Sequence, residues 1–569
     1  MRTLLNTGAG SNSLAALHCE GKELQVSTAI EPFGSYITNL EGEIIFEKYL
    51  LRCLLSPTAR FSIIGTTENS TSHKWGLLVS FKDYSSHEKK LEIPLSCIYA
   101  KNSSFFRNIL CDGGYSCRKG FPPDVLFERI QQDLSWYPPV TRITKVGWQR
   151  APEVYILPKR IYGTFDQSKY HFECSCSGYR NHGNLQEWGQ LAETAVGNTR
   201  FVFALCAAFA AVLLTPLGIE GGGFNFVGES SSGKTTALKI ASSVWGNDII
   251  SWNSTINALE NIASEHNDNL LVLDELGEMD SGSFHQTVYM LANGFGKNRS
   301  SGNGKLQKKN SWRCLFLSSG EVGLMDKLSE KKASCHDGQR VRFLDIPVRA
   351  DMIMHLHGRS SAAQLVSDMV SLADQYTGTA GPQFLEWLTE NLPSRISCLK
   401  RQLKQKEDML CGSEEKTVIR RAARRFALVW IAGEAAWNAE ILPFEMDIEA
   451  AVRSCYDDWL KDYENSSNQE QQQFLYKFRA CIERNRSKFI HVSMSGDNVS
   501  KLIGYYNPKS KGTEYLFSKA TFHTMFPQKK AVEWLKQAGW LKTRKDRDDN
   551  ERVVCGKKGY YYVVVLPKD

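Results

Sequence analysis

Short apolar runs separated by turn-rich connections dominate the first 190 or so residues of the chain. Trp75–Phe81 and Val154–Leu157 are two of these runs. Runs of this length between turn residues are typical of β-strands. The pattern predicts an N-terminal mixed α/β domain over residues 1–190 with mostly antiparallel strands. We interpret it as a binding or assembly domain, because no paired acids or nucleophile arrangement stands out in it.

The pattern changes near residue 191, where continuous apolar runs begin to alternate with helical periods as far as residue 349. A parallel strand that is buried on both faces has an unbroken apolar sequence. The alternation therefore predicts a parallel sheet covered by helices. Helical spacing then dominates residues 350–465, for example over 416–438, and predicts a helical lid.

The last hundred residues predict a further small domain. A polar run, Asn465–Gln473, is either a linker or the start of a polar helix. Apolar residues at helical spacing over 528–538 predict an amphipathic helix, and a charged loop and a strand follow it. This order of elements is typical of a winged helix, so we expect a winged-helix-like domain over residues 466–569.

A glycine-rich turn between a predicted strand, 224–227, and a predicted helix, 237–244, follows the pattern G-x-x-x-x-G-K-[ST]. In such a turn backbone N–H groups face phosphate oxygens, the lysine adds charge at the β and γ positions, and the hydroxyl reaches Mg²⁺. We therefore expect ATP and Mg²⁺ as cofactors. The expected nucleotide-binding residues are Gly228, Ser230, Ser231, Ser232, Gly233, Lys234, Thr235 and Thr236.

An apolar run about forty residues later, Leu270–Leu273, ends in the acids Asp274 and Glu275. Ligand sites in parallel sheets form at the carboxyl ends of the strands, which is where these carboxylates are expected. Asp274 would bind the metal together with Thr235, and Glu275 would orient or deprotonate the attacking water. The two motifs together predict an ATPase.

Two later stretches refine this prediction. Ser311–Glu321 predicts the next strand, and Ser319 or its neighbour Ser318 at the end is suited to position water beside the γ-phosphate. Arg340 and Arg342 precede another short strand, and an arginine here could reach the ATP of a neighbouring subunit. An internal salt bridge is the alternative. A role across subunits would require a homo-oligomer, in a ring or a filament.

A basic, glycine-rich insertion, 296–310, separates the acidic strand from the predicted sensor strand. In a ring ATPase this position can project into the central channel and meet phosphates. The insertion has no aromatic residue for base stacking, so we expect sequence-indifferent DNA contacts; a mobile surface loop is the alternative. The candidate DNA-binding residues are Lys297, Arg299, Lys305, Lys308 and Lys309.

Composition adds three constraints. A chain of 569 residues is too long for one core, and a net charge of +7 permits an anionic partner without requiring one. The 15 cysteines are dispersed and the N-terminus lacks the apolar core of a signal peptide, which favours the cytoplasm. The apolar stretch 201–216 is too short for a membrane span, so we expect a buried helix and no membrane partner.

Several stretches resemble the family catalogued as domain of unknown function 927, and the likeness spans roughly Phe61 to Glu434. They are the phosphate loop Gly228–Leu238, Ala241–Gly246, Tyr289–Gly294, Trp312–Glu321, Arg425–Glu434, Val146–Trp148, Leu157–Pro158 and Gly183–Trp188.

This resemblance implies an AAA+ ATPase akin to the minichromosome-maintenance helicases, of a kind found in mobile elements and prophages. It implies a hexameric ring that acts on DNA, and a separate primase as a potential partner because we find no primase portion ahead of the ATPase. It also makes Arg342 the arginine that acts across subunits. Arg425, or alternatively Arg421, would be a second sensor from the lid. The serines that end the sensor strand replace the asparagine common in related ATPases.

The expected fold class is therefore α/β: an AAA+ P-loop NTPase core with a helical lid, an N-terminal α/β domain and a C-terminal winged-helix-like domain. The leading functional hypothesis is an ATP-dependent DNA helicase or translocase for the replication of a mobile genetic element. The alternative is an ATPase switch that responds to nucleic acid or protein, for example in phage defence, without unwinding. A small-molecule kinase fits neither the length nor the basic insertion.

Overall fold

The chain divides into two compact units, Met1–Val452 and Arg453–Asp569. The computed structural model describes residues 14–19, 22–27, 36–38, 61–69, 75–100, 102–115, 127, 130, 137–143, 145–151, 153–158, 160–163, 170–172, 178–297, 309–329, 341–349, 353–412, 417–494, 502–510, 512–528, 530–544 and 547–566.

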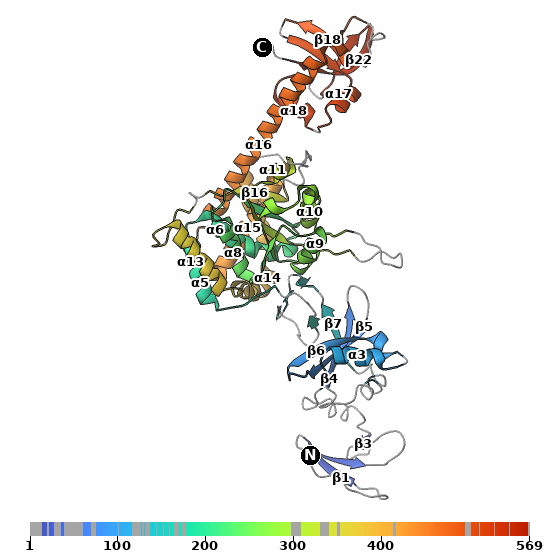
Figure 1. Ribbon diagram of the computed structural model, residues 1–569, viewed down its shortest axis with the longest axis vertical. Coiled ribbons are helices and arrows are strands. Elements are labelled where there is room, and N and C mark those ends of the chain that lie inside the picture. The colour runs from blue at the N-terminus through green and yellow to red at the C-terminus, as the bar shows by residue number, and fades with distance from the viewer. Residues whose placement is uncertain are drawn as a thin grey trace. The chain divides into compact units, whose positions relative to one another are not determined.

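The first unit begins with strands, as the sequence predicts. One sheet has the order β1-β2-β3 and a second, mixed sheet has the order β11-β7-β4-β5-β6 (Figure 1). Leu77, Val79 and Phe81 of β5 pack on Phe106 and Leu110 of α3 to form a small core. The elements are β1 (Leu14–Cys19), β2 (Lys22–Ser27), β3 (Tyr36–Thr38), β4 (Phe61–Asn69), β5 (Trp75–Lys82), β6 (Glu88–Pro94), α2 (Leu95–Ile98), α3 (Ser104–Asp112), β7 (Pro139–Ile143) and β11 (Tyr170–Phe172).

A five-stranded, all-parallel sheet forms the centre of the first unit, in the order β13-β14-β15-β12-β16. Because all five strands are parallel, their carboxyl ends share one edge and their amino ends share the other. The strands are β12 (Gly222–Val227), β13 (Ile249–Ser251), β14 (Leu270–Asp274), β15 (Leu315–Gly320) and β16 (Phe343–Pro347).

Helices cover both faces of this sheet, which explains the unbroken apolar strand sequences. On one face Leu271, Phe316 and Phe343 pack with residues of α9, α10 and α11. On the other, Phe203 of α6 and Phe426 of α15 contact Phe224 of β12. The helices are α5 (Leu185–Ala195), α6 (Thr199–Ala210), η4 (Ala211–Leu213), α7 (Leu214–Leu217), α8 (Lys234–Trp245), α9 (Ile256–Glu265), η5 (Leu276–Glu278), α10 (Ser281–Asn293) and α11 (Leu324–Ser329).

Three helices follow the sheet where the sequence predicts a helical region. They are α13 (Ala362–Gln375), α14 (Ala380–Cys411), which contains Pro393, and α15 (Thr417–Asn438). Among the described residues, one helical stretch, Thr199–Leu217, is long and apolar enough for a membrane span, but it is 89% buried within the protein. This is the buried helix that the sequence predicts in that region.

A small three-stranded sheet joins the N-terminal part to the parallel sheet through buried polar contacts. Its strands are β8 (Gly147–Arg150), β9 (Val154–Leu157) and β10 (Arg160–Tyr162). The Asp268 carboxylate, just before β14, accepts from the backbone N–H of Trp148 at 3.1 Å and from the Thr215 hydroxyl. The Tyr155 hydroxyl donates to the Asp268 carbonyl at 2.8 Å. Desolvation raises the pKa of Asp268, and the hydrogen bonds from the Thr215 hydroxyl and the Trp148 N–H oppose that shift.

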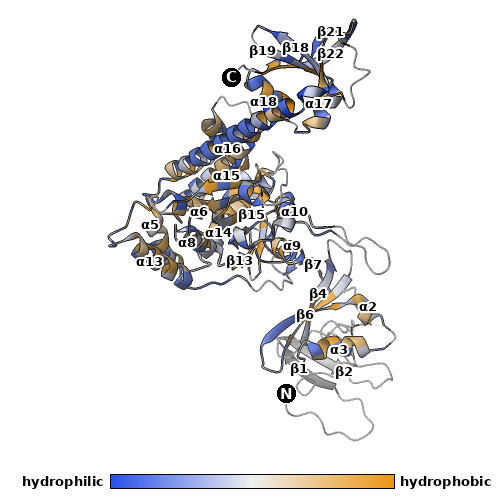
Figure 2. Cartoon of the chain, turned by 45° about the horizontal axis from the view of Figure 1, so that its top comes forward, coloured by the Kyte–Doolittle hydropathy of each residue, from blue (hydrophilic) through white to orange (hydrophobic). Residues whose placement is uncertain are grey.

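The second unit contains the remaining strands, most of the long helix α16, which begins in the first unit, and short helices. Its sheet has the order β17-β18-β19-β22-β20, and β21 pairs with β22. Figure 2 shows α16 as largely hydrophilic, and the polar run Asn465–Gln473 lies inside it, so the expected boundary at residue 466 falls within a helix. The elements are α16 (Ile448–Arg484), η7 (Arg486–Lys488), β17 (Phe489–His491), β18 (Gly504–Lys509), β19 (Gly512–Phe517), α17 (Lys519–Met525), α18 (Ala531–Gln537), β20 (Leu541–Lys542), β21 (Asn550–Val554) and β22 (Lys557–Val565).

The predicted mixed α/β class with a parallel sheet is confirmed. The four-part division of the chain, the lid and the winged helix stay predictions.

Candidate functional site

The glycine-rich turn lies at the carboxyl edge of the parallel sheet, between β12 and α8. Gly228 lies so close to Val348 that a Cβ there would be 2.0 Å from the Val348 carbonyl oxygen. Gly233, the residue before α8, has a φ of 93°, which favours glycine. These two glycines are therefore required by the path of the turn.

Lys234 and Thr235 begin α8, where free backbone N–H groups and the helix dipole favour an anion. The buried Lys234 ammonium donates to the carbonyls of Gly228 at 2.8 Å and Glu229 at 2.6 Å, so it lies over the turn. Thr235 is exposed, and of the other expected residues Ser231 is exposed while Ser232 and Thr236 are buried. Lysine and threonine are thus both placed at the turn.

The acidic pair lies at the same edge, one strand removed from the turn. Strand β15 lies between β12 and β14, and the Gly228 N–H donates to the Gly320 carbonyl at 3.3 Å. At the adjacent position the Ser319 hydroxyl donates to the Asp274 carboxylate. With neighbouring strands about 4.8 Å apart, the turn and the acidic strand are about 10 Å from each other. The sheet thus brings the two motifs together.

The two serines of β15 have different partners. Ser318 is fully buried and accepts from the Trp252 indole N–H at 2.8 Å, whereas Ser319 contacts Asp274. Only Ser319 is therefore in contact with the acidic pair. Its hydroxyl orients the Asp274 carboxylate.

Glu275 has a left-handed backbone conformation, with a φ of 58° and a ψ of 70°. For a residue with a side chain this conformation costs about 1 kcal/mol or more, and such residues are concentrated at functional sites. Glu275 directly follows the last residue of β14 and turns the chain there, so Asp274 and Glu275 both lie at the sheet edge.

The surroundings of the turn include residues that the sequence analysis missed. The Asn198 side chain accepts from the N–H groups of Met354 and His355 and thereby fixes this segment beside α6. A Cβ on Gly233 would lie 3.5 Å from Ile353 and 3.6 Å from Phe201. These contacts join segments far apart in the sequence, so no local pattern indicates them.

The opposite edge of the sheet holds both expected arginines. Arg342 precedes β16, whose Phe343 pairs with Gly223 at the start of β12, and its guanidinium forms a 3.3 Å ion pair with Glu220. Four residues of β12, about 13 Å, separate Gly223 from the glycine-rich turn, which we call the phosphate turn. Arg342 is therefore unsuited to act on the turn of its own chain. Arg340 lies outside the described residues.

The expected sensor role of Arg425 is not supported by its position. Its buried guanidinium donates to the carbonyls of Val341 at 2.7 Å and Gly221 at 2.7 Å, which precede β16 and β12. It therefore lies at the amino edge of the sheet, away from the phosphate turn. Burial lowers the pKa of Arg425 to about 10, and Arg342 adds to the shift, so Arg425 remains charged at neutral pH. Arg425 therefore holds together the segments that precede β12 and β16, and we call it a structural clamp.

The described ends of the basic insertion lie together. Phe295 and Ser311 form an antiparallel bridge, and the Gly296 N–H donates to the Asn310 carbonyl at 2.9 Å. Lys297 and Lys309 are exposed at this base, whereas Arg299, Lys305 and Lys308 lie outside the described residues. The structure thus brings two of the five expected basic residues together.

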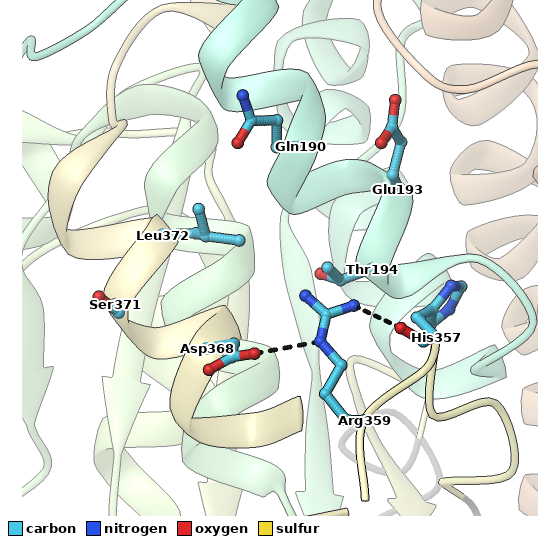
Figure 3. Close-up of a pocket in the computed structure, with 8 residues that line it drawn as sticks. All are labelled: Gln190, Glu193, Thr194, His357, Arg359, Asp368, Ser371 and Leu372. Atoms are coloured by element: carbon cyan, nitrogen blue, oxygen red, sulfur yellow. Dashed lines mark hydrogen bonds and ion pairs between the residues drawn. The ribbon is translucent and has the colours of Figure 1, made fainter. Parts of the chain in front are cut away.

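Two of the cavities in the described part of the chain are lined by charged side chains. One, of about 500 Å³, lies beside the insertion and is lined by Phe295, Lys309 and Arg342 among others. The other, of about 540 Å³, lies between α5 and α13. In Figure 3, Arg359 lies between Asp368, at 3.1 Å, and the His357 carbonyl, at 3.0 Å. Arg359 thus has protein partners on both sides.

The family model described as "Domain of unknown function (DUF927)" matches residues 55–311 of the chain. This range includes the mixed sheet β11-β7-β4-β5-β6, the glycine-rich turn, the acidic pair and the basic insertion, whereas strands β1, β2 and β3 precede it. No curated protein sequence matches the chain.

Among solved structures, "SCCmec type IV Cch - active helicase" has a TM-score of 0.64 at 18% sequence identity, covering 95% of this chain and 97% of that chain. The two chains therefore share a fold over nearly their whole lengths. "The A form apo structure of NrS-1 C terminal region-CTR" has a TM-score of only 0.28 at 12% identity, over 68% of this chain and 90% of that chain.

The clamp assigned to Arg425 predicts a stability effect. Arg425→Ala leaves buried carbonyls of Val341 and Gly221 without a donor and should lower the free energy of unfolding by about 3 kcal/mol. Arg421→Ala, an exposed change on the same helix, should alter it by less than about 0.5 kcal/mol. Urea unfolding followed by circular dichroism measures both. An unchanged unfolding curve for Arg425→Ala would contradict the clamp.

Proposed function

We propose that this chain, whose residues 55–311 match the DUF927 family model, is an AAA+ ATPase that acts as a DNA helicase or translocase in the replication of a mobile genetic element. One observation carries the proposal: the Lys234 turn and the Asp274–Glu275 pair meet at one sheet edge, joined through Ser319. Strand β15 lies between the strands that carry the two motifs. The helicase fold match supports the same class.

The residues at this edge suit ATP. The turn and the start of α8 offer backbone N–H donors to the phosphate oxygens, and Lys234 can exchange its carbonyl partners for the β- and γ-phosphates. Phe201 and Ile353 supply apolar surface beside the turn. The site thus offers positive charge to the phosphates and apolar surface to the rest of the nucleotide.

The site also suits Mg²⁺. The described residues contain no cluster of three or more His, Cys, Asp or Glu side chains. Mg²⁺ at nucleotide sites takes one or two carboxylates together with phosphate oxygens and waters, so Asp274 and the Thr235 hydroxyl would hold it. When bound, Mg²⁺ neutralises charge that develops on the phosphates. Ser319 keeps the Asp274 carboxylate oriented.

Glu275 is the proposed base that orients or deprotonates the attacking water. It follows Asp274 directly, and its left-handed backbone separates the directions of the two side chains. A strained non-glycine residue next to a metal-binding acid supports a role in the chemistry rather than in folding.

We further propose that the chain works as a homo-oligomeric ring, of which a hexamer is the family expectation. Arg342 lies at the sheet edge opposite its own phosphate turn, so a catalytic role requires the turn of a neighbouring subunit. A repeating contact between opposite edges is heterologous and closes into a ring if its rotation permits. In this arrangement each active site needs two chains.

DNA is the proposed partner of the ring, with a separate primase and a cytoplasmic location as further expectations. The helices after β16 would form the lid. In the second unit the order α17, α18, β20, β22 supports a winged helix, with β21 and β22 as its wing. Two lysines of this unit already have acidic partners: Lys542 of β20 pairs with Glu514 at 2.6 Å, and Lys558 of β22 pairs with Glu551 at 3.5 Å. The insertion is therefore the stronger candidate for DNA contact.

Changes at the phosphate site should separate binding from hydrolysis. Lys234→Ala should abolish both, because it removes the charge that faces the phosphates. Glu275→Gln should bind ATP normally and lower the hydrolysis rate by at least about 100-fold. Lys239→Ala, on the same helix, is the matched control and should behave as the unchanged protein. Fluorescent-nucleotide binding and phosphate release measure the effects, and normal turnover by Lys234→Ala or Glu275→Gln would contradict the site.

Mixing variants tests the role across subunits. Arg342→Ala and Lys234→Ala should each be inactive alone, but mixed rings contain sites with an intact Lys234 from one chain and an intact Arg342 from the next. Part of the ATPase activity should therefore return on mixing. Absence of recovery at every mixing ratio would argue for the ion pair with Glu220 as the main role of Arg342.

Strand displacement on forked DNA distinguishes the helicase from the alternative, an ATPase switch that responds to nucleic acid or protein. The proposed function predicts ATP-dependent release of the labelled strand that Glu275→Gln does not support. DNA-stimulated hydrolysis without any displacement would favour the switch.

A further inference from the structure

The cavity beside the basic insertion includes Arg342, but its other basic and aromatic residues are not used by the proposed ATP site. It has a volume of about 500 Å³, within the range of ligand pockets. Its walls come from the last turns of α10, the two ends of the insertion and the residues just before β12 and β16. It therefore lies at the amino edge of the sheet, opposite the phosphate turn.

Positive charge dominates its lining. The lining includes four cationic side chains and one carboxylate, Glu220, which pairs with Arg342. The Arg313 guanidinium donates to Thr215 at 3.3 Å, and the Lys297 ammonium donates to Gln286 at 3.4 Å. The Lys297 ammonium thus has a neutral partner, whereas Arg313 also interacts with the buried Asp268 carboxylate. An anionic ligand would therefore add compensation at Lys297.

Two aromatic rings are half-exposed in the same cavity. Tyr289, on α10, is 49% exposed and Phe295, at the base of the insertion, is 54% exposed. The Lys309 ammonium lies 5.0 Å from the centre of the Phe295 ring. Gly294 has a φ of 74°, which favours glycine, and a Cβ on this residue would be 2.1 Å from the Trp312 carbonyl oxygen. Only glycine therefore fits where the chain turns toward Phe295. The fold thus holds Phe295 at the cavity while leaving its ring accessible.

We propose that this cavity binds single-stranded DNA, with a base stacked on Phe295 and the adjacent phosphates contacted by Lys297 and Lys309. The inference rests on the proposed function and names the site through which the ring holds its strand. Aromatic rings beside basic groups are the usual means of holding single strands without sequence preference, since every base has a π-face. The stacking residue comes from the end of α10, just ahead of the insertion.

A neighbouring subunit's triphosphate would meet this cavity at Arg342, and the other walls of the cavity suit it less well than they suit DNA. Compact triphosphate charge is favoured at helix N-termini, whereas α10 presents its C-terminal carbonyls, the negative end of its dipole. A DNA strand carries one negative charge per phosphate along its backbone, and its bases can stack on the exposed rings of Tyr289 and Phe295.

The test measures binding of a fluorescein-labelled (dT)20 and of a matched oligonucleotide with abasic sites, by anisotropy, with the full chain and a slowly hydrolysed ATP analogue. Phe295→Ala should weaken (dT)20 binding by about tenfold and leave binding of the abasic strand unchanged. Phe295→Trp should restore binding. Phe105→Ala removes a ring of similar exposure, 65%, from the N-terminal part and should have no effect.

A charge variant gives an independent readout. Lys309→Ala should reduce the slope of log Kd against log salt by about one, the contribution of a single phosphate contact, on both oligonucleotides. An equal loss of (dT)20 and abasic binding for Phe295→Ala, or no loss at all, would overturn the stacking site. A loss confined to fluorescent ATP binding would assign the cavity to the neighbour's nucleotide instead.

These outcomes are separable from a failure of the proposed function. A chain that binds (dT)20 through Phe295 without hydrolysing ATP would refute the ATPase and retain the site. A chain that hydrolyses ATP without binding (dT)20 would refute the site alone.

Discussion

The parallel direction of the five central strands is the constraint on which the arrangement of chemistry depends. It collects every carboxyl end at one edge, where the phosphate turn, Asp274 and Glu275 meet through β15. It also collects every amino end at the other edge, where Arg342, Arg425 and the cationic cavity lie. One edge is thus suited to hold a nucleotide and the other to contact something outside the subunit.

This polarity explains why part of the site could be predicted from sequence. A glycine-rich turn between a strand and a helix, and acids after an apolar run, are local patterns, and parallel strands bring their ends together without further information. Ser319 was predictable for the same reason. Its contact with Asp274 was not, because it depends on β15 being inserted between the other two strands.

Other residues depend on contacts that sequence spacing does not encode. Arg425 lies on a helix whose apolar face was evident, yet its guanidinium reaches carbonyls some 80 and 200 positions earlier in the chain. Phe295 was overlooked because it precedes the basic insertion and becomes part of it only when its bridge with Ser311 closes. Local patterns therefore located the glycine-rich turn and the acidic pair better than the residues of the opposite edge.

The buried contacts of Asp268 have a practical consequence for dissecting the molecule. The Trp148 N–H and the Tyr155 hydroxyl meet this residue just before the strand that ends in the acidic pair. A fragment cut at residue 190 to isolate the nucleotide-binding part would strip both donors away and expose the apolar surface beneath β8 and β9. Recombinant truncations should therefore start upstream of Lys145.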